Sequence, residues 1–169
     1  MDEHQRVQKS EAMMSNSSEN YLEKIRVAAT PEQSFQAVAR QMEKWWTVTT
    51  EGAFERVGDR VTVRFLPDYG YWIFEASVMN ESNRLEMICV EAHHKVEGQP
   101  KEIDQEWLGT NIIWQFETVG DKTEITMTHD GLTPSLNCWG ICLDGWNHFF
   151  KNSLKAFLDG GEPSPHAAG

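Results

Sequence analysis

The chain has 169 residues, of which 40% are apolar, and it carries seven tryptophans and a net charge of −11. A single domain of this size buries roughly 70% of the surface of its unfolded chain, so a sizeable core is expected. The negative charge repels phosphate backbones and anionic membrane surfaces, which argues against nucleic acid or a membrane as a partner. No run approaches the roughly 20 apolar residues that a membrane-spanning helix needs.

The cysteine content is low and odd, with three residues in all. Such a number gives no disulfide framework and is typical of a reducing compartment. The N-terminal segment lacks the apolar core of a signal peptide. We therefore expect a cytoplasmic protein.

The two ends of the chain differ in composition from its middle. Residues 1–19 are rich in Ser, Asn and Glu and show no hydrophobic periodicity, which predicts a disordered tail. Residues 161–169 predict a second, flexible tail. Residues 20–160 contain no repeat and no linker, so we expect them to form one domain.

The first elements are a strand and a helix. Ile25 and Val27 lie on one face of a predicted strand that begins at Tyr21. Thr30 then has the features of a helix N-cap, because a proline follows at the first helical position and Gln33 can complete a capping box. The apolar residues after it recur at helical spacing as far as the pair Trp45-Trp46.

A series of strands follows. Alternating apolar and polar residues predict strands near residues 61–65, 72–78, 85–89, 108–116 and 125–129. The short links at 80–83 and 119–121 require the strands that they join to be antiparallel. The polar stretch 91–106, which includes His93 and His94, is predicted to be a long solvated loop.

The last element is a long amphipathic helix. From Cys138 to Leu158 the apolar residues fall three and four apart, and Gly160 is a typical helix stop. The order of the elements indicates an α+β fold. In this fold a curved antiparallel sheet wraps around a long C-terminal helix, with two short helices after the first strand.

Several motifs resemble a known superfamily over residues 21–165. They are Ile25-x-Val27, Thr30-Pro31-Glu32, Phe35, Trp45-Trp46, Trp107-Leu108-Gly109-Thr110, Ile112, Trp114, Phe116, the segment 126–132, Cys138, Cys142, Gly145-Trp146, Leu154 and Gly160-Gly161-Glu162-Pro163. Their order and spacing resemble the START-like superfamily, also called SRPBCC or birch-pollen-allergen-like. Within it, the chain is most similar to bacterial proteins that resemble the activator of the heat-shock-chaperone ATPase.

The resemblance implies a helix-grip fold but no particular activity. The superfamily includes ligand carriers, polyketide cyclases, hormone receptors and co-chaperone domains, so the fold does not decide the function. Bacterial members of this subfamily usually stand alone, without the additional partner-binding domain of the eukaryotic activator. The family signature supplies no metal.

A helix packed across a concave sheet can enclose an apolar pocket. We predict that the following residues line it: Phe65, Trp72, Phe74, Trp114, Phe116, Met127, His129, Trp146 and Phe150. If the space is incompletely filled, it can hold a ligand in a volume of roughly 300–1,000 Å³. The alternative is that these side chains fill it as an ordinary core.

Two polar features are candidates for chemistry. His129 is expected at the mouth of the pocket, where an imidazole can titrate near neutral pH or bond a ligand; alternatively it ties a turn to the next helix. Cys138 and Cys142 share a helix face, but a metal site needs further ligands, and packing is the simpler interpretation. We expect no cofactor and no metal.

Three functional hypotheses follow. The first is a non-catalytic binding module for an apolar or aromatic small molecule. The second is a co-chaperone-like domain that stimulates a heat-shock chaperone, and the third is a cyclase or hydrolase that uses His129 as an acid or base. The sequence leaves the choice between a monomer and a dimer open.

Overall fold

The computed structural model describes residues 19–167. Its elements are, in chain order, β1 (Tyr21–Val27), α2 (Pro31–Arg40), α3 (Met42–Trp45), β2 (Thr50–Glu51), β3 (Arg60–Phe65), β4 (Gly70–Asn80), β5 (Arg84–His94), η1 (Lys101–Gln105), β6 (Asn111–Val119), β7 (Lys122–Asp130), α4 (Trp139–Trp146), η2 (Asn147–Leu154) and α5 (Lys155–Leu158). This order confirms the α+β fold predicted from the sequence. Nearly all of the predicted N-terminal tail, residues 1–18, lies outside the described residues.

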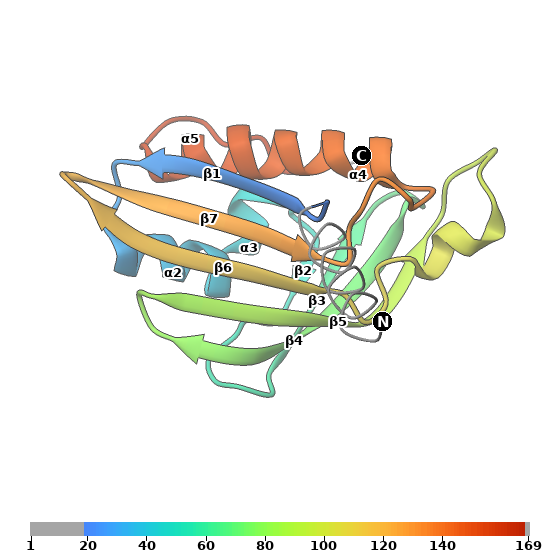
Figure 1. Ribbon diagram of the computed structural model, residues 1–169, viewed down its shortest axis with the longest axis horizontal. Helices are drawn as coiled ribbons and strands as arrows, with labels where there is room; N and C mark the ends of the chain where they lie inside the picture. The colour runs from blue at the N-terminus through green and yellow to red at the C-terminus, as the bar shows by residue number, and fades with distance from the viewer. Residues whose placement is uncertain (1–18, 168–169) are drawn as a thin grey trace, which may run out of the picture.

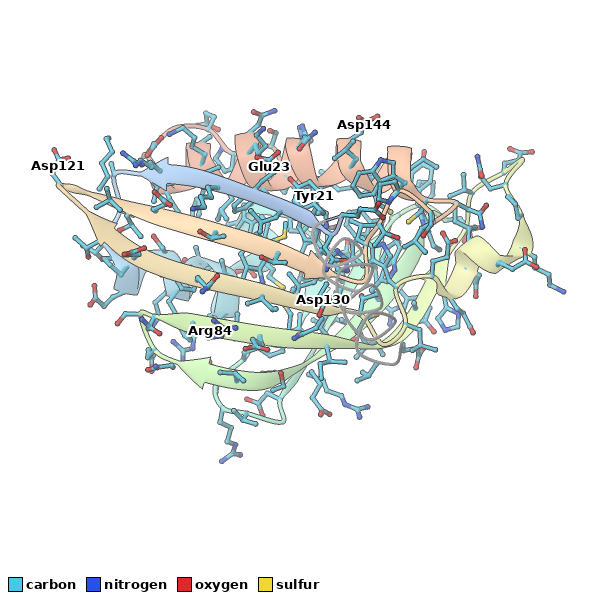
Figure 2. The ribbon with its side chains drawn as sticks, viewed as in Figure 1. Tyr21, Glu23, Arg84, Asp121, Asp130 and Asp144 are labelled. Atoms are coloured by element: carbon cyan, nitrogen blue, oxygen red, sulfur yellow. The ribbon has the colours of Figure 1, made fainter. Side chains whose placement is uncertain are left out.

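The sheet has seven antiparallel strands in the order β1-β7-β6-β5-β4-β3-β2. The pairing of β4 with β5 shifts register between Ile73 and Phe74 and again between Ala76 and Val78. Such bulges bend a strand and increase its twist, which curves this part of the sheet. Exposed carboxylates, among them Asp121, Asp130 and Asp144, lie on the outside of the molecule (Figure 2).

The predicted C-terminal helix is confirmed and lies along the sheet (Figure 1). Trp146, Phe150 and Leu154 follow one another at a spacing of four, and all three are buried. The middle of the helix, η2, has the wider turns of a π-helix, which apolar spacing alone does not reveal. Gly160 ends the helix at φ +83°, where glycine is unstrained, and the Gly161 amide donates to the Ala156 carbonyl over 2.7 Å.

The two short helices fill one end of the space between sheet and C-terminal helix. Thr30 caps α2 in a complete capping box with Gln33, as the sequence predicts. Phe35 of α2 packs edge-on to Phe116 of β6, with ring centroids 5.7 Å apart. Trp45 of α3 meets Trp114 in the same way at 5.9 Å. This end of the interior is therefore a packed core.

Strand β5 is longer than the sequence suggests. Glu91, Ala92 and His93 pair with β4, so the predicted loop begins only after His94. The β5–β6 connection, residues 95–110, then forms η1 and approaches the start of α4. Its Glu106 carboxylate accepts the backbone amides of Asn137 and Cys138 at 2.8 and 2.9 Å. A carboxylate is stabilising at a helix N-terminus, so this contact ties the connection to the helix.

We expected a flexible tail from residue 161, but the C-terminal strap (residues 161–167) is hydrogen-bonded to the domain. The His166 amide donates to the Trp46 carbonyl at 2.8 Å, and the Val48 amide donates to the His166 carbonyl at 3.0 Å. The His166 ring also stacks near Phe65, with centroids 5.2 Å apart. Composition alone does not reveal these contacts because they depend on the position of α3.

Within residues 19–167, no helix combines the length and apolarity that crossing a bilayer requires.

Candidate functional site

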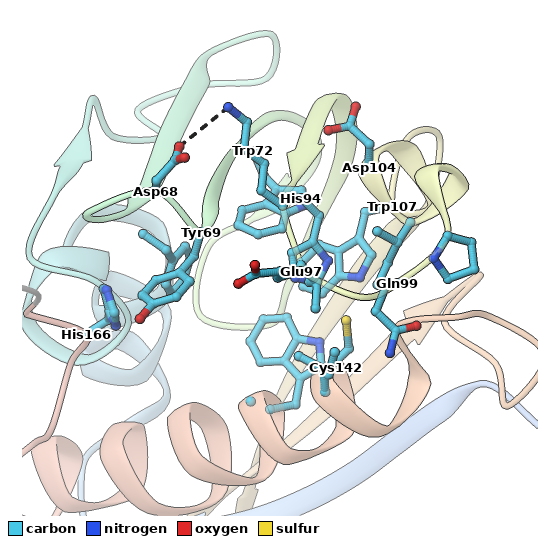
Figure 3. A pocket seen from close by; sticks show the side chains of 18 of the residues that line it. Asp68, Tyr69, Trp72, His94, Glu97, Gln99, Asp104, Trp107, Cys142 and His166 are labelled. Carbon is cyan, nitrogen blue, oxygen red and sulfur yellow. Dashed lines mark ion pairs between the residues drawn. The ribbon is translucent and has the colours of Figure 1, made fainter.

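An open cavity of about 820 Å³ lies at the other end of the interior (Figure 3). Its walls are the first half of the C-terminal helix, the β3–β4 loop, the β5–β6 connection and the strap. The aromatic residues that line it are Trp46, Phe65, Tyr69, Trp72, Trp107, Trp146 and Phe149, together with His94 and His166. The volume is within the range of small-molecule sites, and the wall is mostly apolar.

The rings of the cavity wall pack against one another. Trp107 and Trp146 are nearly parallel, with centroids 5.8 Å apart, and Trp46 lies 5.0 Å from Trp146. Trp72 contacts Trp107 at 5.4 Å and Phe65 at 5.4 Å. Each of these rings is therefore supported by contact with another aromatic ring.

The structure brings only three of the nine predicted residues to this cavity: Phe65, Trp72 and Trp146. The other six are buried in the packed core and do not line it: Phe74, Trp114, Phe116, Met127, His129 and Phe150. The prediction that all nine face one open space is therefore corrected. The reason is the position of α3, because Trp45 covers Trp114 while the next residue, Trp46, closes the inner end of the cavity.

His129 does not lie at the mouth of the cavity. Its side chain is fully buried between Trp146 and Thr110. The Trp146 Nε1–H group donates to Nδ1 of His129 over 3.0 Å, which leaves the proton of the neutral ring on Nε2. This Nε2–H group faces Thr110 Oγ1 at 2.9 Å, and the threonine hydroxyl donates to the Trp107 carbonyl at 2.7 Å.

Burial lowers the pKa of His129 to about 3. Protonation of Nδ1 would also break its bond with Trp146, and within residues 19–167 no acidic group is hydrogen-bonded to the ring. At neutral pH the side chain is a neutral, fully bonded link between two tryptophans of the cavity wall. The expectation that His129 titrates near neutral pH at the pocket mouth is corrected, and the hypothesis of catalysis by His129 loses its basis.

Several residues that line the cavity were missed because they lie outside the regular strand pattern. Trp107 follows the polar part of the β5–β6 connection, and Tyr69 belongs to the β3–β4 loop. His94 was placed in a solvated loop, but it is buried, and its ring centroid lies 5.1 Å from that of Trp72. The one sequence signal for this wall is Trp107, a large apolar residue directly after a polar stretch.

The other candidate groups show little reactivity. Burial lowers the pKa of His94, so its ring is neutral at pH 7. Cys142 lines the cavity, and the pKa of its thiol is raised by the Cys138 thiol and by burial. A protonated thiol is a poor nucleophile. No group of three or more His, Cys, Asp or Glu residues suited to a metal occurs in the described part of the chain.

Comparisons with known proteins agree with this architecture. Residues 28–159 match the family described as "Activator of Hsp90 ATPase homolog 1-like protein". No curated protein shows a significant match. Among solved structures, the Aha1 dimer from Colwellia psychrerythraea is similar with 27% identity and a TM-score of 0.66, covering 83% of this chain and 96% of that one.

Two further structures share the fold at lower identity. Protein MLL2253 from Mesorhizobium loti has 19% identity and a TM-score of 0.62, covering 82% of this chain and 97% of that one. PFC0360w, an HSP90 activator from Plasmodium falciparum, has 15% identity and a TM-score of 0.54, covering 82% of this chain and 95% of that one.

Proposed function

This chain belongs to the family of activator of Hsp90 ATPase homolog 1-like proteins, and we propose that it is a non-catalytic binding module for an apolar or aromatic small molecule. The observation that carries the proposal is the open, aromatic-walled cavity of about 820 Å³ beside the C-terminal helix. Burial of apolar ligand surface there is worth about 25 cal/mol per Å² before the costs of binding are subtracted.

The properties of the wall favour binding over chemistry. Burial lowers the pKa of His94, and the Cys138 thiol together with burial raises the pKa of Cys142, so both of these lining groups are neutral at pH 7. General acid–base catalysis needs a group with a pKa near the working pH within reach of the substrate. His129, the candidate that the sequence suggests for this role, is enclosed behind Trp146.

A matched pair of glycines on α4 provides the test. Gly145 lines the cavity, whereas Gly140 is exposed on the same helix, and a Cβ atom added at either position meets nothing within 4 Å. Gly145→Leu therefore places an alkyl side chain in the cavity without a clash at the backbone. Gly140→Leu makes the same substitution outside the cavity, and both replace glycine by a better helix former.

The readout is the affinity for an uncharged naphthylamine probe whose fluorescence rises in apolar surroundings. We expect Gly145→Leu to weaken probe binding at least tenfold and Gly140→Leu to leave it unchanged, with both variants at least as stable as the parent protein. Equal binding by all three proteins would place the probe elsewhere on the surface. No binding by the parent protein would overturn the proposal.

A second candidate function is stimulation of a heat-shock chaperone ATPase. It is favoured by the family description and by the fold shared with an HSP90 activator. The test adds this protein to an Hsp90-type chaperone and measures ATP hydrolysis. A rise in rate that Gly145→Leu does not reduce would support this function independently of the cavity, and no effect at micromolar concentrations would exclude it.

A further inference from the structure

The mouth of the cavity carries charged groups that the aromatic wall does not explain. Three carboxylates, Asp68, Glu97 and Asp104, and two lysines, Lys95 and Lys101, belong to the cavity lining. Figure 3 shows the Glu97 side chain in the middle of the view, between Tyr69 and Trp107. Glu97 is exposed, so its carboxylate lies at the solvent-facing side of the cavity lining.

Among these five groups, negative charge exceeds positive charge after the ion pairs are formed. Lys95 is matched by Asp68, with Nζ and Oδ1 3.5 Å apart. The Asp104 carboxylate lies 3.7 Å from Nδ1 of His93, and that contact is an ion pair only when the ring is protonated. Glu97 has no basic partner among residues 19–167.

The buried His94 in the lining adds no positive charge to oppose this excess. The ring of His94 is neutral at pH 7, since burial lowers its pKa. The inner wall is built largely of tryptophan rings, whose faces attract cations through the ring quadrupole. The whole chain carries a net charge of −11, so its long-range field also draws cations toward the surface.

From these observations we propose that the cavity selects cationic amphiphiles, with an apolar or aromatic body among the tryptophans and an ammonium group at the mouth near Glu97. This inference rests on the proposed binding function and specifies its ligand class. An anionic ligand with the same body meets repulsion from Glu97 and from the net charge of the chain. Lys101 is the one lining cation without an acidic partner among residues 19–167, so it opposes the selectivity.

The experiment compares three competitors with the same ten-carbon chain: decyltrimethylammonium, decanol and decyl sulfate. Each competitor is titrated against the bound uncharged naphthylamine probe, at concentrations below the concentration at which that competitor forms micelles. We expect the cation to bind about tenfold more tightly than the anion at low ionic strength, with the ratio shrinking as salt is added. An anion that binds as tightly as the cation would overturn the charge selectivity. Failure of all three to displace a bound probe would also overturn it, because the proposed cationic class would not bind; only a protein that does not bind the probe would overturn the binding function itself.

Three variants, each with one charge removed, test whether the preference for cations arises at the mouth of the cavity. Glu97→Gln should reduce the cation-to-anion ratio about two- to fivefold, the scale of one exposed charge pair. Lys101→Gln should raise the ratio by a similar factor. Glu32→Gln removes the same charge from α2, away from the cavity, and should leave the ratio unchanged. An equal fall in the Glu97 and Glu32 variants would mean that only net charge matters and would contradict a site at the mouth.

Discussion

The indole N–H group of Trp146 donates a hydrogen bond of 3.0 Å to Nδ1 of His129, and both side chains are buried. Trp146 belongs to the C-terminal helix and lines the cavity. His129 belongs to β7 of the sheet and lies behind the Trp146 ring, outside the cavity lining. The bond therefore fixes the orientation of a cavity-wall ring from the side opposite the cavity. Thr110 extends the same link to the carbonyl of Trp107, a second ring of the wall.

Substitutions at Trp146 should separate this bond from the packing of the ring. Trp146→Phe keeps an aromatic ring but leaves Nδ1 of His129 unpaired, which should lower the free energy of unfolding by about 1–3 kcal/mol. Trp146→Ala also creates a cavity and should cost about 3–5 kcal/mol. Urea denaturation measures both. A Trp146→Phe variant that is as stable as the parent protein would show that the hydrogen bond contributes little.

The buried imidazole also predicts a pH dependence. The pKa of His129 falls from its usual 6.5 to about 3 in the folded protein, so between these values the unfolded chain binds the additional proton. Stability from this group is therefore complete above about pH 6.5 and is lost as the pH falls toward 3, with a slope of up to about 1.4 kcal/mol per pH unit.

The variant His129→Gln, which does not titrate, supplies the control for this slope. Carboxylates with a lowered pKa, such as Glu86 and Asp159, lose their contribution at lower pH in both proteins. The difference between the two proteins from pH 6.5 to 4.5 therefore isolates His129. Identical slopes in this window would contradict a neutral, buried histidine.

The contact between Glu106 and the start of α4 should hold the β5–β6 connection against the helix. Glu106→Ala removes the acceptor of the Asn137 and Cys138 amides, and we expect a loss of about 1 kcal/mol. Hydrogen exchange at these two amides should become faster. Glu102→Ala changes an exposed residue of η1 and should leave both amides protected. Unchanged exchange in the Glu106 variant would show that the connection is held by Ile103 and Trp107 instead.

The C-terminal strap leads to a separate prediction. The Val48 amide donates to the carbonyl of His166, so it should be protected from hydrogen exchange in the full chain. A chain that ends after Glu162 lacks this acceptor, and Val48 should then exchange rapidly. The Ala76 amide, which donates to Asp59, provides the control because the truncation does not touch it. A Val48 amide that exchanges rapidly in the full chain would indicate that the strap is open in solution.

The fold could be predicted because periodic patterns report which face of an element is buried. Val61 and Val63 alternate along a strand and Trp146 and Phe150 recur along a helix, and both pairs are buried as expected. The same periodicity does not show whether a buried face meets another side chain or an empty space. This depends on α3, where Trp45 packs into the core and Trp46 faces the cavity.

His129 illustrates the limit of pattern reasoning at a single residue. Its alternation with Ile125 and Met127 correctly placed it on the inner face of β7. The predicted exposure of His129 is wrong because the Trp107 ring packs against the imidazole, with ring centroids 4.5 Å apart. Trp107 lies on a long connection, so local sequence does not show this contact. The partners that decide the pKa of a group are brought together by tertiary structure, and local sequence does not identify them.

The most direct test of the binding function is a fluorine NMR spectrum of the protein labelled with 5-fluorotryptophan. It is recorded with and without the uncharged naphthylamine probe. Four tryptophans line the cavity: Trp46, Trp72, Trp107 and Trp146. The remaining three do not: Trp45, Trp114 and Trp139. We predict that saturating probe shifts the fluorine signals of the first group and leaves those of the second near their original positions. Saturable binding that moves only the second group, or a spectrum that the probe does not change, would contradict a ligand site between the helix and the sheet.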